Sequence, residues 1–123
     1  MTTQELSRFK WVEMAVFNSA GLTGSYQPLN GPAQYAIFTG LGFEDSVKSI
    51  KIYNGSTVGV TISFDGVTRN DFWPAGATII LDVQANHADN SAYGSGTLNG
   101  AQGQVIYGLG TAGVGSIYIS AYR

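Results

Sequence analysis

The feature that most constrains the fold of this chain is a series of short runs in which apolar and polar residues alternate. In residues 58–65 every second position is apolar, and the positions between are small or polar; the apolar residues are Val58, Val60, Ile62 and Phe64. Residues 115–122 repeat the pattern, with Ile117, Ile119 and Ala121 on one side. A period of two is typical of a β-strand that packs one face on a hydrophobic core.

Turn signals separate these runs. Asn54-Gly55 stands between the alternating runs 46–53 and 56–65, and this dipeptide favours the type I′ turn of a two-residue hairpin. We therefore predict that the two runs pair as a β-hairpin. Pro74 and Gly76 mark a second turn, which leads into a nearly continuous apolar run at 77–83. Such a run predicts a strand that is covered on both faces.

Further strands are predicted at 34–39, 104–109 and 115–122, and a long polar loop at 84–103 has room for a short strand near 93–98. Residues 8–18 fit a strand or a short helix, and their aromatic and β-branched content favours the strand. Together these elements predict one all-β domain, an antiparallel β-sandwich or jelly roll of about seven to eight strands. We expect residues 21–123 to form this domain, and residues 1–20 to form an N-terminal arm or its first strand.

Composition excludes several classes of function. The 123 residues include no cysteine, one histidine, six basic and eight acidic side chains. There is thus no disulfide and no thiolate, and the single His87 excludes sites that need two imidazoles. A net charge of −2 without a basic cluster argues against nucleic-acid or membrane partners. The first residues lack the apolar stretch of a secretory signal, so we expect synthesis in the cytoplasm.

Few residues suggest chemistry. Asp65 and Asp71 flank a loop and could contribute to a calcium site or form a glycosidase pair. Aspartates in such loops more often cap their own backbone. His87 lies in a polar loop with no nucleophile near it in sequence, and the glycine pattern 108–113 leads into a strand rather than a helix. We therefore expect no catalytic residue, no metal and no cofactor, and a protein that is not an enzyme.

The low charge suits a subunit of a larger assembly, because interface cores are poor in charge and rich in aromatic residues and methionine. The N-terminal segment concentrates large apolar side chains, and a tryptophan precedes the Pro-Ala-Gly turn. The candidate contact residues are Phe9, Trp11, Met14, Phe17 and Trp73. Two alternatives stay open: Trp73 closes the core, or tryptophan and the tyrosines stack on sugar rings in a carbohydrate-binding module.

Several segments resemble a group of small structural proteins of tailed bacteriophages. They are the Asn-Gly turn within Ile50–Thr57, the SFDG corner at Ser63–Gly66, the PAG turn at Pro74–Gly76, the LD strand at Leu81–Val83, the C-terminal strand Gly115–Tyr122, and Leu22–Gln27. The resemblance covers about residues 22–122 and leaves the N-terminal arm outside. Its motifs are turn and strand signals, with no catalytic signature.

The resemblance implies a virion component: a capsid decoration (cement) protein that stabilises the head lattice, or a tail or neck subunit. The expected partners are the major capsid or other virion proteins and further copies of the chain itself, as a dimer or trimer. The expected location is the virion, after synthesis in the host bacterial cytoplasm. A β-sandwich that binds a host-surface glycan is the alternative function.

Overall fold

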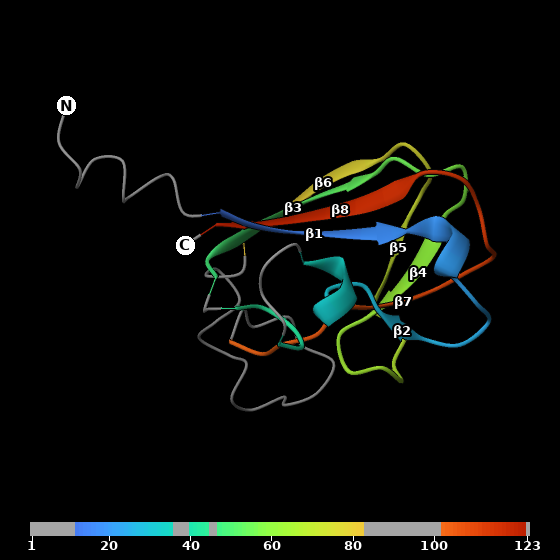
Figure 1. The fold of residues 1–123 in the computed structure, drawn as a ribbon. Helices are drawn as coiled ribbons and strands as arrows, with labels where there is room; N and C mark the ends of the chain where they lie inside the picture. Colours follow the sequence, from blue (N-terminus) through green and yellow to red (C-terminus); the bar gives the residue numbers. More distant parts are fainter. Residues whose placement is uncertain (1–11, 36–39, 45–46, 83–101, 123) are drawn as a thin grey trace, which may run out of the picture.

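The computed structural model describes residues 12–35, 40–44, 47–82 and 102–122 (Figure 1). Within them the chain forms eight β-strands and two short 3-10 helices, η1 (Ser19–Gly21) and η2 (Pro32–Gln34). No helix in these four ranges is long and apolar enough to cross a bilayer. The fold is therefore all-β, as the alternating runs predict.

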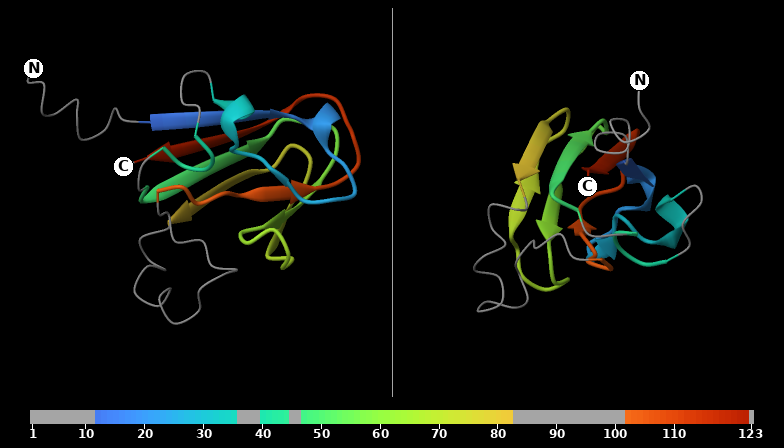
Figure 2. Two further views of the ribbon diagram at one scale, coloured as in Figure 1. Left: turned by 60° about the horizontal axis from the view of Figure 1, so that its bottom comes forward. Right: turned by 90° about the vertical axis from the view of Figure 1, so that its left-hand side faces the viewer.

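The strands form two antiparallel sheets of four strands each. The first sheet has the order β1 (Val12–Asn18), β8 (Ser116–Tyr122), β3 (Ser49–Asn54) and β6 (Thr78–Asp82). The second sheet has the order β2 (Gln27–Pro28), β7 (Tyr107–Leu109), β4 (Val60–Ser63) and β5 (Asp71–Trp73). Figures 1 and 2 show the sheets as two layers, which makes the fold a β-sandwich.

The core lies between the layers and is built from the inward sides of the alternating runs. Residues with no exposed surface include Ile50, Ile52 and Ile117 from the first sheet, and Val60, Ile62 and Trp73 from the second. The sequence alternation in 58–65 and 115–122 therefore arises because one side of each run packs on the core between the two sheets. In β8 the pattern holds over the whole strand, where Ile117, Ile119 and Ala121 are buried.

The N-terminal segment supplies the first strand of the sandwich. Strand β1 pairs with β8 along its length, from Val12 opposite Tyr122 to Asn18 opposite Ser116. Ala15 and Phe17 point into the core. The strand interpretation of this segment is confirmed for residues 12–18, and the helix alternative is wrong there; residues 8–11 lie outside the described residues.

The predicted hairpin at Asn54-Gly55 is wrong. Strand β3 pairs with β8 and β6, whereas β4 lies in the other sheet and pairs with β5 and β7. A type I′ turn would require a positive φ at Gly55, but Gly55 is not among the glycines with positive φ. The chain instead crosses between the layers at residues 54–59. Both runs alternate because each packs one face on the shared core, a pattern that hairpin partners and crossover partners have in common.

The turn at Trp73–Gly76 is confirmed, since Gly76 has φ +79° and the Ala77 N–H donates to the Pro74 carbonyl at 3.1 Å. The strand after it is not covered on both faces, because Ile80 on its outer side is 72% exposed. Strand β7 is shorter than the predicted 104–109. Of the predicted strand 34–39, Gln34 belongs to η2 and residues 36–39 lie outside the described residues, as does the possible strand at 93–98.

Candidate functional site

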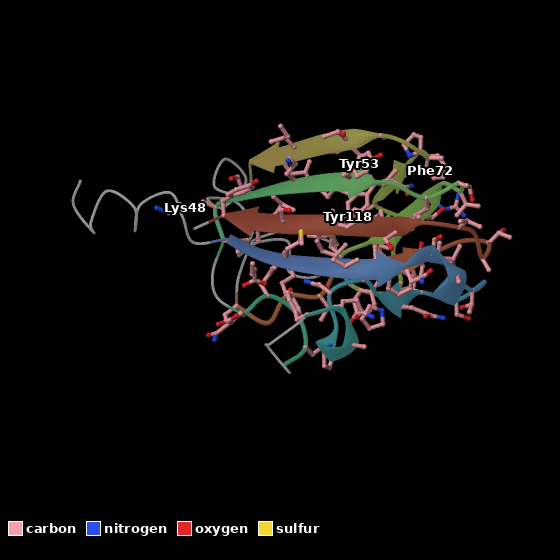
Figure 3. The ribbon with its side chains drawn as sticks, turned by 45° about the horizontal axis from the view of Figure 1, so that its top comes forward. Lys48, Tyr53, Phe72 and Tyr118 are labelled. Carbon is pink, nitrogen blue, oxygen red and sulfur yellow. The ribbon has the colours of Figure 1, made fainter. Side chains whose placement is uncertain are left out.

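The most distinctive surface of the molecule is the solvent side of the first sheet. The register of the strand pairs aligns three rows of residues across all four strands on this side, and the third row is Val12–Tyr122–Ser49–Asp82. We call the eight residues of the other two rows the outer face; these rows are Val16–Tyr118–Tyr53–Thr78 and Met14–Ser120–Lys51–Ile80. Figure 3 views this sheet from its outer side, with Tyr53 and Tyr118 on the neighbouring strands β3 and β8.

The outer face is unusually apolar for a solvent-exposed sheet. Ile80 is 72% exposed, Met14 50% and Tyr53 43%. These residues occupy the positions between the buried ones, where a sheet packed on one side normally carries polar side chains. Met14, Tyr53 and Tyr118 line an open depression together with Lys51, Thr78 and Ser120.

The Tyr53 and Tyr118 side chains, at the centre of the outer face, pack against each other. Their ring centroids lie 6.0 Å apart with an interplanar angle of 18°, so the rings are stacked. Tyr53 also lies against the backbone of Gly55, where an added Cβ would come within 2.8 Å of its ring. Stacked rings with fixed neighbours form a rigid, amphipathic contact surface that loses little conformational entropy on binding.

Charge is almost absent from the outer face, although Asp82 stands in the third row beside it. Lys51 is the one charged residue among the eight of the outer face, and it faces Ser120 and Ile80 across the strand pairs. A surface with this composition has the signature of an interface core rather than of a solvated face. Removing water from the outer face would therefore cost little free energy, except at the Lys51 ammonium group. The aliphatic part of the Lys51 side chain can lie along the apolar surface while the ammonium group stays in water.

The sequence-predicted contact residues separate into three groups. Met14 lies on the outer face. Phe17 and Trp73 pack inside the sandwich, with 5% and 0% of their surface exposed, so the alternative that Trp73 closes the core is confirmed. As core residues, neither Phe17 nor Trp73 presents a contact surface to a partner. Phe9 and Trp11 lie outside the described residues.

Sequence reasoning missed Tyr53, Tyr118 and Ile80 as members of one surface. The tyrosines sit on the polar sides of two alternating runs that are far apart in sequence, and only the β3–β8 pairing brings them together. Ile80 lies in the continuous apolar run 77–83, which could have indicated an exposed apolar side chain. The same run fits a strand buried on both faces equally well.

The Asp65 carboxylate is used by its own loop. Oδ1 accepts hydrogen bonds from the N–H groups of Val67 and Thr68 and from the Ser63 hydroxyl, and Oδ2 accepts one from the Thr68 hydroxyl at 2.7 Å. These bonds, that of the Thr68 N–H first, hold the pKa of Asp65 well below its usual range. This is the backbone-capping alternative, and it leaves the carboxylate already saturated with donors.

Asp71 is likewise engaged locally, because its Oδ2 accepts the Trp73 indole N–H at 3.1 Å. In the part of the chain that the structure describes, no group of three or more histidine, cysteine, aspartate or glutamate residues could hold a metal. His87 lies outside that part. The glycine pattern 108–113 joins β7 to β8, so no helix follows it.

Among the residues that the structure describes, one carboxylate is buried. Glu13 in β1 is 6% exposed, and it accepts hydrogen bonds from the Tyr35 hydroxyl at 2.8 Å and from the Glu44 N–H at 2.9 Å. Burial, and then the bond to Glu13, raise the pKa of the Tyr35 phenol well above its ordinary value of 10.0, so the hydroxyl remains a donor. The arrangement fastens two loop residues to β1, which is a structural task.

Comparison of the chain with protein-family models, with curated proteins and with solved structures finds no match.

Proposed function

We propose that the protein is a non-enzymatic structural subunit of a tailed-bacteriophage virion, a decoration (cement) protein that binds the head lattice. The observation that carries the proposal is the outer face: an exposed, apolar and nearly uncharged sheet surface centred on the stacked Tyr53–Tyr118 pair. Exposed apolar surface of this kind marks sites of protein contact.

The energetics favour a protein partner. Tyrosine and methionine are enriched in interface cores, and tyrosines are among the residues that most often dominate binding energy. Fully burying a side chain such as Ile80 or Met14 is worth about 1.5–3 kcal/mol. The outer face therefore offers several such contributions in one rigid patch, while the single ammonium of Lys51 needs one acceptor on the partner.

The sequence resemblance supports the virion context. Its motifs correspond to local features of this fold: the SFDG corner is the Asp65-capped loop after β4, the PAG turn joins β5 to β6, and the last motif is β8. They are fold-level signals, and they support a structural subunit more than any chemistry.

A glycan-binding module is the alternative, and the tyrosine geometry weighs against it. The Tyr53 and Tyr118 rings stack on each other with centroids 6.0 Å apart, which leaves at most one face of each ring for a sugar. A protein partner that packs over the ring edges and the flanking Met14 and Ile80 fits this arrangement better.

The test uses particles of the phage that encodes this chain. We expect mass spectrometry of purified virions to find the protein in a fixed ratio to the major capsid protein, and immunogold labelling to place it on heads. Labelling of the tail or neck would contradict the decoration role. Absence from particles, combined with specific binding on a glycan array, would replace the proposal with the glycan alternative.

A matched pair of variants tests the surface. Tyr53→Ser/Tyr118→Ser removes the aromatic centre of the outer face, and Val67→Ser removes a side chain that is 81% exposed in a distant loop. We expect the double variant to bind particles at least about tenfold more weakly and the Val67 variant to bind normally. Equal binding by both would show that the outer face is not the attachment surface.

A further inference from the structure

Strand β6 leaves one side of its backbone without partners in the described chain. It lies at the margin of the first sheet and pairs on its other side with β3 (Figures 1 and 2). The Asn54 N–H donates to the Ala77 carbonyl at 2.9 Å. By the alternation of an antiparallel ladder, the peptide groups of Ile79 and Leu81 then face β3, and those of Thr78, Ile80 and Asp82 face outward.

This edge lacks the devices that usually prevent strand addition. The five residues Thr78–Asp82 contain no proline, lysine or glycine, their single charged residue is Asp82 at the end of the strand, and the exposed Ile80 stands at their centre. Proteins normally blunt an edge with charge, proline or a bulge, because unpaired strands recruit other strands. An unblunted edge of this length is thus itself a candidate interface.

The other described edges are protected. Strand β2 has two residues and contains Pro28, and β5 has three residues and is followed by Pro74. Strand β1 is flanked by η2, and Glu13 fastens Tyr35 and Glu44 beside it. The contrast singles out β6 as the edge where another strand can add.

We propose that β6 pairs antiparallel with β6 of a second copy of this chain, about a two-fold axis at Ile80. In this register Ile80 stands opposite Ile80, Ile79 opposite Leu81, and Thr78 opposite Asp82. The outward-facing peptide groups of Thr78, Ile80 and Asp82 then oppose one another. The Ile80–Ile80 pair and the two Thr78–Asp82 pairs therefore each exchange both backbone hydrogen bonds.

Self-pairing satisfies the chemistry of the edge in three ways. The outward peptide groups of both copies become paired, and the two exposed Ile80 side chains cover each other. In this register Asp82 of one copy is opposite Thr78 of the other, so the two aspartates are not opposed. A two-fold axis makes the interface isologous, which is the commonest arrangement for two identical chains. The two four-stranded sheets become one continuous sheet, and their outer faces become one surface. This inference does not depend on the proposed virion role, because it concerns the purified protein alone.

The first measurement is the mass of the purified full chain in solution, by sedimentation or light scattering from about 1 to 100 µM. We expect a concentration-dependent dimer of the 13.0 kDa chain. Ile80→Lys places two like charges opposite each other at the two-fold axis. Ile80→Pro removes a backbone N–H that faces away from β3 and toward the second copy. Each should raise the dimer dissociation constant at least tenfold, while Val67→Lys, at another exposed apolar position, leaves it unchanged.

A second measurement tests the register. The chain has no cysteine, so Ile80→Cys introduces a unique thiol. Opposed residues of a hydrogen-bonded pair have Cα atoms about 5.5 Å apart, so oxidation or a short bismaleimide should link two copies of this variant and not two copies of Val67→Cys. Thermal melting of Ile80→Lys close to that of the wild type shows that the fold is intact.

A wild-type monomer at 100 µM would overturn the proposal. So would a dimer that persists in Ile80→Lys, or equal crosslinking through positions 67 and 80. Because these measurements contain no virion, their failure would leave the particle-binding experiment to be judged separately.

Discussion

The side-chain amide of Asn54, at the end of β3, donates a hydrogen bond of 2.9 Å to the main-chain carbonyl of Trp73, at the end of β5. The bond joins the two layers, because β3 belongs to the first sheet and β5 to the second. The same amide donates to the Val58 carbonyl at 2.9 Å, and Oδ1 accepts the Ser56 N–H. With no exposed surface, Asn54 fastens the corner where the chain leaves one sheet for the other.

Replacing Asn54 should therefore be costly. Asn54→Leu removes the hydrogen bonds to the Trp73 and Val58 carbonyls and the acceptor of the Ser56 N–H, while the Ser56 hydroxyl still donates to the Val58 carbonyl. We expect the free energy of unfolding to fall by about 2–4 kcal/mol. Asn18→Ala is the control, because Asn18 is exposed and its side chain accepts only the Ala20 N–H at 3.0 Å. That cap should be worth about 1 kcal/mol. Equal losses in urea denaturation would show that Asn54 is not a corner fastening.

Two glycines with positive φ should differ in their tolerance of alanine. Gly76 has φ +79° and open space where a Cβ would sit, so Gly76→Ala should cost about 1–2 kcal/mol for the backbone conformation alone. Gly115 has φ +99°, and its Cβ would lie 2.4 Å from the Gly55 carbonyl oxygen. Gly115→Ala must displace that backbone, and we expect a melting temperature clearly below that of Gly76→Ala. The reverse order would contradict the close approach of residues 55 and 115.

The Asp65 loop should give stability a pH dependence. The pKa of this carboxyl is lowered from 3.8 in the folded protein, so its ionised form stabilises the fold above that value. The contribution is lost as the pH falls toward the folded pKa. The melting temperature of the wild type should exceed that of Asp65→Asn at pH 7, and the gap should narrow by about pH 2.5.

Thr68→Val removes the hydroxyl that donates to Asp65 Oδ2 and should reduce this pH dependence without abolishing it. A gap between wild type and Asp65→Asn that stays constant from pH 7 to pH 2.5 would refute the role of the ionised carboxylate.

Two N-terminal truncations distinguish an arm from a strand. Removing residues 1–11 keeps all of β1, and we expect native melting with weaker binding to particles if the arm contacts a neighbour. Removing residues 1–13 also deletes Glu13, the acceptor for the Tyr35 hydroxyl and the Glu44 N–H. The longer truncation should lose about 2–3 kcal/mol more stability, since the half-buried Tyr35 hydroxyl and Glu44 N–H lose their hydrogen bonds to Glu13. Equal melting of the two truncations would show that Glu13 contributes nothing to the fold.

The alternating runs predict that strands exist, but they do not predict which strands pair with one another. Val60 and Ile62 are buried as their spacing indicates, but Asn54-Gly55 is compatible both with a hairpin and with a crossover between sheets. The Asn54 side chain is buried at this crossover and bonds the Trp73 carbonyl of the other layer, a contact between residues distant in sequence that the local pattern does not contain. The outer face was hidden for the same reason: Tyr53 and Tyr118 become neighbours only because β8 lies between β1 and β3.

The place of β8 in the first sheet also governs when the fold can form. Two of the three strand pairings of that sheet involve β8, the last strand, and β1 has no other partner among the described strands. At ribosomal rates of about 5–20 residues per second, β1 waits roughly 5–20 s for Ser116–Tyr122 to be made. Through that interval Ala15 and Phe17 have no sheet to join, and transiently exposed apolar surface of this kind favours aggregation. Long-range strand pairing of this kind also makes refolding slow, on the order of milliseconds to seconds.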